Sequence, residues 1–97
     1  MRIGFIGAGN MGTAIIKGIL SKRFMDAHDI FISRKRPELS AELVREGVQI
    51  AKSNTDLVRS VDCVVLAVKP VYAAQVLSEV YDAIAEKLVI SIVAGWT

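Results

Sequence analysis

Three glycines near the amino terminus, Gly7, Gly9 and Gly12, stand at G-x-G-x-x-G spacing directly after the short apolar segment 3–6. The segment 13–16 then reads as the opening of a helix, so the pattern predicts a strand, a tight turn and a helix. In such a turn the first glycine permits the sharp bend, the second lets the backbone approach a pyrophosphate, and the third lets the helix pack close to the strand. The free N–H groups of the helix amino terminus would face the phosphates. The pattern favours a dinucleotide site over a glycine-rich turn that merely joins a strand to a helix.

A second informative group, Ser33 followed by Arg34, Lys35 and Arg36, comes directly after the apolar segment 30–32. Dinucleotide-binding folds that prefer NAD place an acidic residue here, about 20 residues after the glycines, to bind the ribose 2′-hydroxyl. A hydroxyl and three cations suit a 2′-phosphate instead, and we expect Ser33 and Arg34 to donate hydrogen bonds worth about 1.5–3 kcal/mol each. NADPH is therefore the expected cofactor, preferred over NADH by roughly tens to thousands-fold, although NADH remains possible. A solvated basic turn or a nucleic-acid patch is the alternative.

The elements that position these residues follow from the alternation of apolar strand-like and helix-like segments. Strands are predicted over residues 2–6, 30–32, 48–51, 61–68 and 88–93. Helices are predicted from the glycine turn to Ser21, over 38–46 and over 71–86, with a further short helix that ends at Arg59. Strand–helix alternation predicts an α/β fold, a Rossmann-type doubly wound parallel sheet of five strands in the order 3-2-1-4-5 with helices on both faces. Ligand would lie over the carboxyl ends of the first and fourth strands, where the loops 7–12, 67–70 and 94–95 meet.

Helical spacing also predicts which side chains face the sheet. In the first helix these are Met11, Ala14, Ile15, Ile19 and Leu20, with Gly18 at a close contact; in the second Leu39, Leu43 and Val44; in the last Ala73, Leu77, Val80, Tyr81 and Ile84. Pro37 suits the start of the second helix and Gly47 its carboxyl-terminal cap. Ser53, Asn54 or Thr55 could cap the short helix that follows, which would give Asn54 a purely structural role.

The amino-acid composition restricts the number of domains and the kinds of ligand that the chain is expected to bind. The chain has 97 residues, 53% of them hydrophobic, and a net charge of +2, which suits one domain and argues against a dedicated nucleic-acid binder. Ten of the twelve Lys and Arg but only six of the ten Asp and Glu lie in residues 1–59, so an anionic ligand belongs to the first half. We expect no metal site, because Cys63 sits in an apolar core segment and His28 in a polar connection. No apolar segment approaches the length of a membrane span, and a cytoplasmic location is expected.

Three separated motifs together resemble a known family. The segments 3–11, 67–70 and 89–92 leading to 94–95, which read IGFIGAGNM, AVKP and VISI before Ala-Gly, are similar to the N-terminal half of pyrroline-5-carboxylate reductase. The resemblance implies reduction of the imine of 1-pyrroline-5-carboxylate to proline by NADPH or NADH.

The resemblance also implies a role for particular residues. It places the pyrophosphate at Ile6, Gly7, Ala8, Gly9, Asn10 and Met11, the 2′-phosphate at Ser33 and Arg34, the adenosine near Asn54, and the ribose and nicotinamide beside Ala67, Val68, Lys69, Pro70, Ala94 and Gly95. Lys69 then belongs to a cofactor-lining loop rather than acting as a general acid, and no catalytic residue is assigned within the chain.

The family continues into a helical domain that forms the dimer and supplies most of the substrate pocket. Residues 1–97 are therefore expected to be a single NAD(P)-binding domain that binds cofactor, turns over poorly, and self-associates through apolar surface near the last strand and Trp96. The complete protein is expected to be a homo-oligomer with no membrane or nucleic-acid partner. Alternatives are a β-hydroxyacid dehydrogenase, against which Lys69 and Pro70 count, a deazaflavin-linked NADP reductase, and a non-catalytic nucleotide-sensing module.

Overall fold

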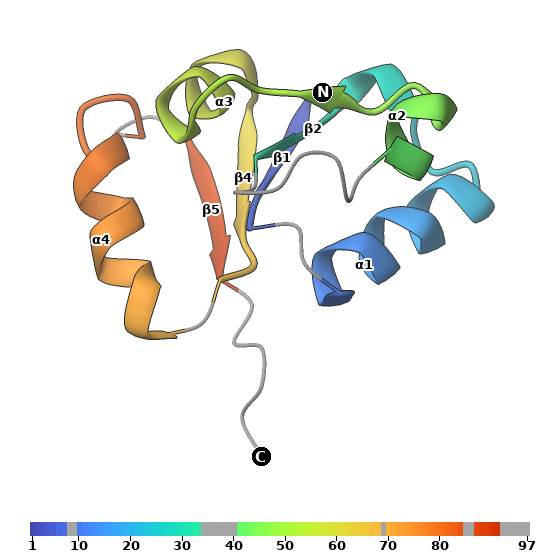
Figure 1. Ribbon diagram of the computed structural model, residues 1–97. Coiled ribbons are helices and arrows are strands. Elements are labelled where there is room, and N and C mark those ends of the chain that lie inside the picture. The colour runs from blue at the N-terminus through green and yellow to red at the C-terminus, as the bar shows by residue number, and fades with distance from the viewer. Residues whose placement is uncertain (8–9, 34–40, 69, 85–86, 92–97) are drawn as a thin grey trace.

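A parallel sheet of five strands, in the order β3-β2-β1-β4-β5, forms the middle of the computed structural model (Figure 1). The structure describes residues 1–7, 10–33, 41–68, 70–84 and 87–91. The strands are β1 (Ile3–Ile6), β2 (Ile30–Ser33), β3 (Gln49–Ile50), β4 (Cys63–Leu66) and β5 (Leu88–Ser91). The predicted strand order is confirmed. Successive strands are added on one side of β1 up to β3 and on its other side from β4 onward, so the strand order reverses between β1 and β4.

Helices cover both faces of this sheet. They are α1 (Asn10–Ser21), the short 3₁₀ helix η1 (Ala27–Asp29), α2 (Ala41–Glu46), α3 (Asn54–Ser60) and α4 (Pro70–Val80). Figure 1 shows α1 and α2 on one side of the sheet and α3 and α4 on the other. This is the arrangement that right-handed crossovers require, because the chain crosses to the second face when it passes from β3 to β4.

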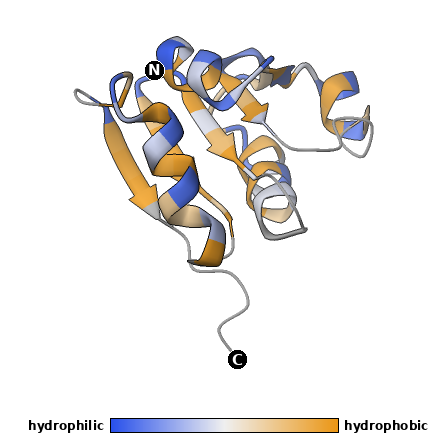
Figure 2. Cartoon of the chain, turned by 60° about the vertical axis from the view of Figure 1, so that its left-hand side comes forward, coloured by the Kyte–Doolittle hydropathy of each residue, from blue (hydrophilic) through white to orange (hydrophobic). Residues whose placement is uncertain are grey.

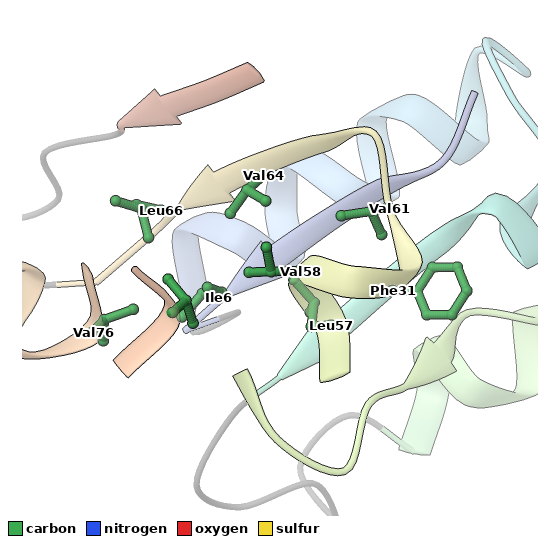
Figure 3. Close-up of a cluster of buried hydrophobic side chains, with 9 residues drawn as sticks. Ile6, Phe31, Leu57, Val58, Val61, Val64, Leu66 and Val76 are labelled. Carbon is green, nitrogen blue, oxygen red and sulfur yellow. The ribbon is translucent and has the colours of Figure 1, made fainter. Parts of the chain in front are cut away.

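Alternate residues of the central strands point to opposite faces, and each face carries its own core. The face under α1 and α2 is filled by Phe5, Ile16, Ile30, Ile32, Leu43, Val48 and Val65. The face under α3 and α4 is filled by Ile6, Phe31, Leu57, Val58, Val61, Val64, Leu66, Val76 and Val80 (Figure 3). Cys63 is buried as expected, and this burial raises the pKa of its thiol.

Gly4, in the middle of β1, allows α3 to approach the sheet closely. A Cβ at this position would lie 2.5 Å from Leu57 Cδ2 and 3.2 Å from Val61 Cγ1. A methyl group at such distances would force Leu57 or α3 to shift, so the absence of a side chain at Gly4 sets how near Leu57 lies to β1.

The predicted buried face of α1 is partly wrong. Ile16 is fully buried although it was not expected to be, whereas Ala14 is exposed and Ile15, Ile19 and Leu20 are half-buried. A Cβ at Gly18 would meet nothing within 4 Å, so this glycine makes no close contact. The buried stripe runs through Gly12 and Ile16, four residues apart, because α1 is turned on its axis relative to the stripe that the apolar spacing predicted.

The faces of the other helices show the same kind of error. Val80 of α4 is buried as predicted and Val76 is buried in addition, while Leu77 and, just beyond the helix, Tyr81 are exposed. In α2, Leu43 is buried as predicted, but Val44 is exposed and the predicted residues 38–40 lie outside the described ranges. Gly47 follows α2 with a φ of +109°, as its predicted capping role requires.

Strand β5 ends the sheet with apolar side chains that the described elements cover only in part. Leu88, Val89 and Ile90 are 60%, 38% and 44% exposed. Figure 2 shows β5 hydrophobic over most of its length at the edge of the sheet. Residues 92–93 of the predicted strand lie outside the described ranges. Within the described ranges, no helix has both the length and the apolar content needed to cross a bilayer.

Candidate functional site

The carboxyl ends of β2, β1 and β4 are joined by two backbone hydrogen bonds. The N–H of Gly7 donates to the carbonyl of Ser33 over 2.8 Å, and the N–H of Ala67 donates to the carbonyl of Ile6 over 2.9 Å. The turn after β1 therefore lies between the ends of its two neighbouring strands. This is the edge where ligands bind in open parallel sheets, at the point where strand order reverses.

Gly7 has the backbone conformation that the motif predicts for its first glycine. Its φ is +80°, and a Cβ there would lie 2.4 Å from Val68 Cγ1 and 3.1 Å from the carbonyl oxygen of Ala67. Both conformation and space thus require glycine, and the result is a turn that packs directly on the segment after β4.

Side-chain hydrogen bonds connect Ser33, at the end of β2, to residues of α3 and α4. The Ser33 hydroxyl donates to Asn54 Oδ1 over 2.5 Å, and Asn54 Nδ2 donates to Glu79 Oε2 over 3.1 Å. The Thr55 hydroxyl donates to the backbone carbonyl of Glu79 over 3.4 Å. These bonds connect β2, the first turn of α3 and the last turn of α4.

The first turn of α3 settles which residue caps it. Ser53 is the N-cap, with an extended backbone and a side chain that accepts from the N–H of Asp56 over 3.1 Å. Asn54 is the first residue of the helix itself. Its side chain is therefore not needed as a cap and reaches Ser33 and Glu79 instead.

The other predicted site residues are distributed as follows. Ala67 is buried and Val68 half-buried beside Gly7, while Asn10 and Met11 lie in the first turn of α1 and Pro70 begins α4. Ala8, Gly9, Arg34, Lys69, Ala94 and Gly95 lie outside the described residues. The structure thus brings Ile6, Gly7, Ser33, Asn54, Ala67 and Val68 to one edge, and their contacts with a cofactor stay a prediction.

Glu79 is the residue that sequence reasoning missed. It lies 25 residues from Asn54 in the chain, on the exposed side of a helix whose predicted role was only to cover the sheet. No motif marks it, and only the packing of α4 beside α3 brings it to the site. Among the described residues, no group of three or more His, Cys, Asp or Glu side chains could hold a metal ion.

The family model described as "NADP oxidoreductase coenzyme F420-dependent" matches residues 2–95. The chain is 39% identical to pyrroline-5-carboxylate reductase from Methanosarcina acetivorans, over 97% of this chain and 36% of the relative. It is 36% identical to the enzyme of the same name from Escherichia coli, over 99% of this chain and 36% of the relative. The chain therefore spans about a third of the length of these curated relatives.

Solved structures agree in fold. Pyrroline carboxylate reductase from Plasmodium falciparum with NADP bound superposes with a TM-score of 0.84 at 30% identity, covering 96% of this chain and 33% of that one. The Coxiella burnetii pyrroline-5-carboxylate reductase gives 0.87 at 32% identity, covering 97% and 36%. An imine reductase from Myxococcus stipitatus in complex with NADP⁺ gives 0.83 at 26% identity, covering 98% and 32%.

The resemblance drawn from the three sequence motifs is thus confirmed along the whole chain. Since the family model covers all but three of its 97 residues, the chain belongs to the NADP oxidoreductase family described as coenzyme F420-dependent, and it is similar to the N-terminal, NADP-binding part of pyrroline-5-carboxylate reductases.

Proposed function

We propose that this chain is the NADP(H)-binding domain of a reductase that converts 1-pyrroline-5-carboxylate to proline, with NADPH preferred and NADH possible. The observation that carries the proposal is the convergence of Gly7, Ser33 and Asn54 where the strand order reverses. The likeness to the NADP-bound reductase from Plasmodium falciparum supports it.

The described residues fit a dinucleotide. Gly7 lets the turn pack directly on Val68, and the amino terminus of α1 follows this turn, so backbone N–H groups there suit a pyrophosphate. Ser33 ends β2, and its hydroxyl donates to Asn54 at the start of α3, so both residues lie near the place where this fold binds the adenosine ribose of a dinucleotide. Ala67 and Val68 directly follow β4, on the side of the turn where we expect the second ribose and the nicotinamide to bind.

In the complete reductase the bound cofactor supplies a hydride to the imine carbon, while the imine nitrogen gains a proton and the C=N bond becomes a single bond. The chain spans about a third of its relatives, so we infer that the imine is held mainly by the remainder of the protein, which also forms the homo-oligomer. Correct positioning of two reactants lowers a barrier by about 7–11 kcal/mol. We therefore expect the 97-residue chain to bind cofactor and to form proline far more slowly than the complete enzyme.

The first test is a calorimetric titration of the chain with NADPH and with NADH, repeated with Arg34→Ala. NADPH should bind at least about tenfold more tightly, and Arg34→Ala should remove most of that difference by deleting a donor to the 2′-phosphate. Arg59→Ala is the control, because Arg59 is an exposed cation in the last turn of α3, near the amino end of β4. If circular dichroism shows a folded chain that binds neither nucleotide, the proposal is wrong.

A second candidate is a deazaflavin-linked NADP reductase, which the description of the matching family favours. The complete protein should be assayed with 1-pyrroline-5-carboxylate plus NADPH and, separately, with a reduced deazaflavin plus NADP⁺. Turnover in the first assay alone supports the imine reductase, and turnover in the second alone supports this alternative.

A further inference from the structure

Two hydrogen bonds link Glu79 to Asn54 and Asn54 to Ser33, and the groups involved determine which partner donates in each. An ionised carboxylate only accepts hydrogen bonds, so Asn54 must turn its amide nitrogen toward Glu79, at 3.1 Å. The amide oxygen of Asn54 then faces Ser33, at 2.5 Å. Since an amide oxygen also only accepts, the hydroxyl of Ser33 has to donate to it.

A hydroxyl has one hydrogen to donate, and that of Ser33 is used by Asn54. Toward a ligand, Ser33 Oγ therefore presents lone pairs only. A ribose 2′-hydroxyl can donate to such an oxygen, whereas a 2′-phosphate dianion, which has no hydrogen to donate, is repelled by it. An accepting Ser33 differs from the sequence-based expectation that Ser33 donates to the 2′-phosphate, and it would leave discrimination for NADPH to the cations at 34–36.

We propose that Glu79 is a specificity-determining residue for the cofactor: through Asn54 it holds Ser33 as an acceptor and so limits the preference for NADPH over NADH. The inference rests on the proposed function, because it requires the adenosine ribose to lie beside Ser33. Ser33 is 9% exposed and Asn54 is half-buried, so water competes only weakly for the hydrogen bond between them, which is the one that would lie beside the ligand. Glu79 acts as a positioning residue and touches no reacting atom.

The decisive variant is Glu79→Gln, which keeps the shape of the side chain but can donate as well as accept. A donating Gln side chain lets the Asn54 amide turn over, so that its nitrogen faces Ser33 and the hydroxyl becomes free to donate to a phosphate. The ratio of the NADH to the NADPH dissociation constant should rise about three- to tenfold, the worth of roughly one neutral hydrogen bond. Asp82→Asn is the control, since it removes the same charge from an exposed residue just beyond α4 and should leave the ratio unchanged.

Ser33→Ala tests the same inference from the other end. If Ser33 accepts, its loss should weaken NADH binding several-fold more than NADPH binding; if Ser33 donates to the phosphate, the order is reversed. A readout without nucleotide is the nuclear Overhauser contact between the Asn54 side-chain amide protons and the Ser33 β-protons, which should strengthen in Glu79→Gln.

The outcomes separate this inference from the proposed function. Tight nucleotide binding with an unchanged ratio in Glu79→Gln, or a Ser33→Ala loss that falls mainly on NADPH, overturns the role of Glu79 alone. A folded wild-type chain that binds neither nucleotide overturns the proposed function and the inference together.

Discussion

Two glycines of this chain have opposite surroundings, and this gives their substitutions opposite expected effects. Gly4 lies in β1 under Leu57, where a built Cβ would come within 2.5 Å of a side-chain carbon. Gly18 lies on the exposed side of α1, where a built Cβ would meet nothing within 4 Å. The first glycine is required by packing, whereas the second only costs the helix conformational entropy.

Gly4→Ala should therefore lower the free energy of unfolding by about 1–3 kcal/mol, because an overpacked core must shift Leu57 or α3. Gly18→Ala should raise it by about 0.5–1 kcal/mol, because alanine favours the helix and nothing resists its methyl group. Urea unfolding followed by circular dichroism measures both. Changes of the same sign in the two variants would contradict this account of the packing.

Among single residues, the sequence predicted the turn at Gly7 but not the surroundings of Gly18, where no described residue makes the expected close contact. Gly7 could be assigned because the turn geometry of the motif depends on local backbone alone. Whether Asn54 caps α3 could not be predicted, since Ser53 and Thr55 offered the same capping chemistry. The observed N-cap at Ser53 shows that Asn54 is not the cap, and its contact with a ligand stays a prediction. Glu79 could not be found, because its role depends on the packing of two helices.

The elements were predictable in type and order, but not in how each helix is turned on its axis. The strand order follows from βαβ connectivity and crossover handedness, which local patterns reveal. The buried faces of α1 and α4 cannot be predicted from local patterns in this way, because both helices carry apolar side chains around more than half of their circumference. Several apolar stripes are then possible, and packing on the twisted sheet selects the one through Ile16 in α1 and through Val76 and Val80 in α4.

The capping of α3 is an element-scale feature with a measurable cost. Ser53→Ala removes the acceptor for the Asp56 N–H and should lower the free energy of unfolding by about 1 kcal/mol. Hydrogen exchange at the Asp56 amide should become faster, since the first turn of α3 loses its closing bond. Ser53→Asp keeps an acceptor at the same place and should retain both properties; if it behaves like the alanine variant, the cap is not what stabilises this turn.

For the molecule as a whole, the two edges of the sheet differ. On the β3 side the edge strand is only two residues long, which limits pairing with another chain. On the β5 side the edge strand carries Leu88, Val89 and Ile90 with much of their surface exposed, and no charged residue lies among them. Such an edge is suited to pairing with a second copy of the chain.

We therefore expect the 97-residue chain to self-associate as its concentration rises, with sedimentation velocity showing a growing dimer fraction. Ile90→Lys should shift this equilibrium toward monomer by placing a charge on the edge strand. Val71→Lys, which alters an exposed apolar residue of α4, should not. A wild-type chain that stays monomeric throughout, or an equal effect of the two lysines, would argue against association through β5.

The central place of β1 in the sheet also governs when the fold can be completed on the ribosome. Ile3 pairs with Ile30 on one side and with Cys63 on the other, so the first strand to be synthesised waits for its second neighbour until about two thirds of these 97 residues exist. Until then one hydrogen-bonding edge of β1 has no partner from β4, and the carboxyl ends that bring Gly7 and Ala67 together cannot meet. Because pairing between strands distant in sequence is slow, the nascent chain has a period in which β1 and β2 form an open edge that a chaperone could protect.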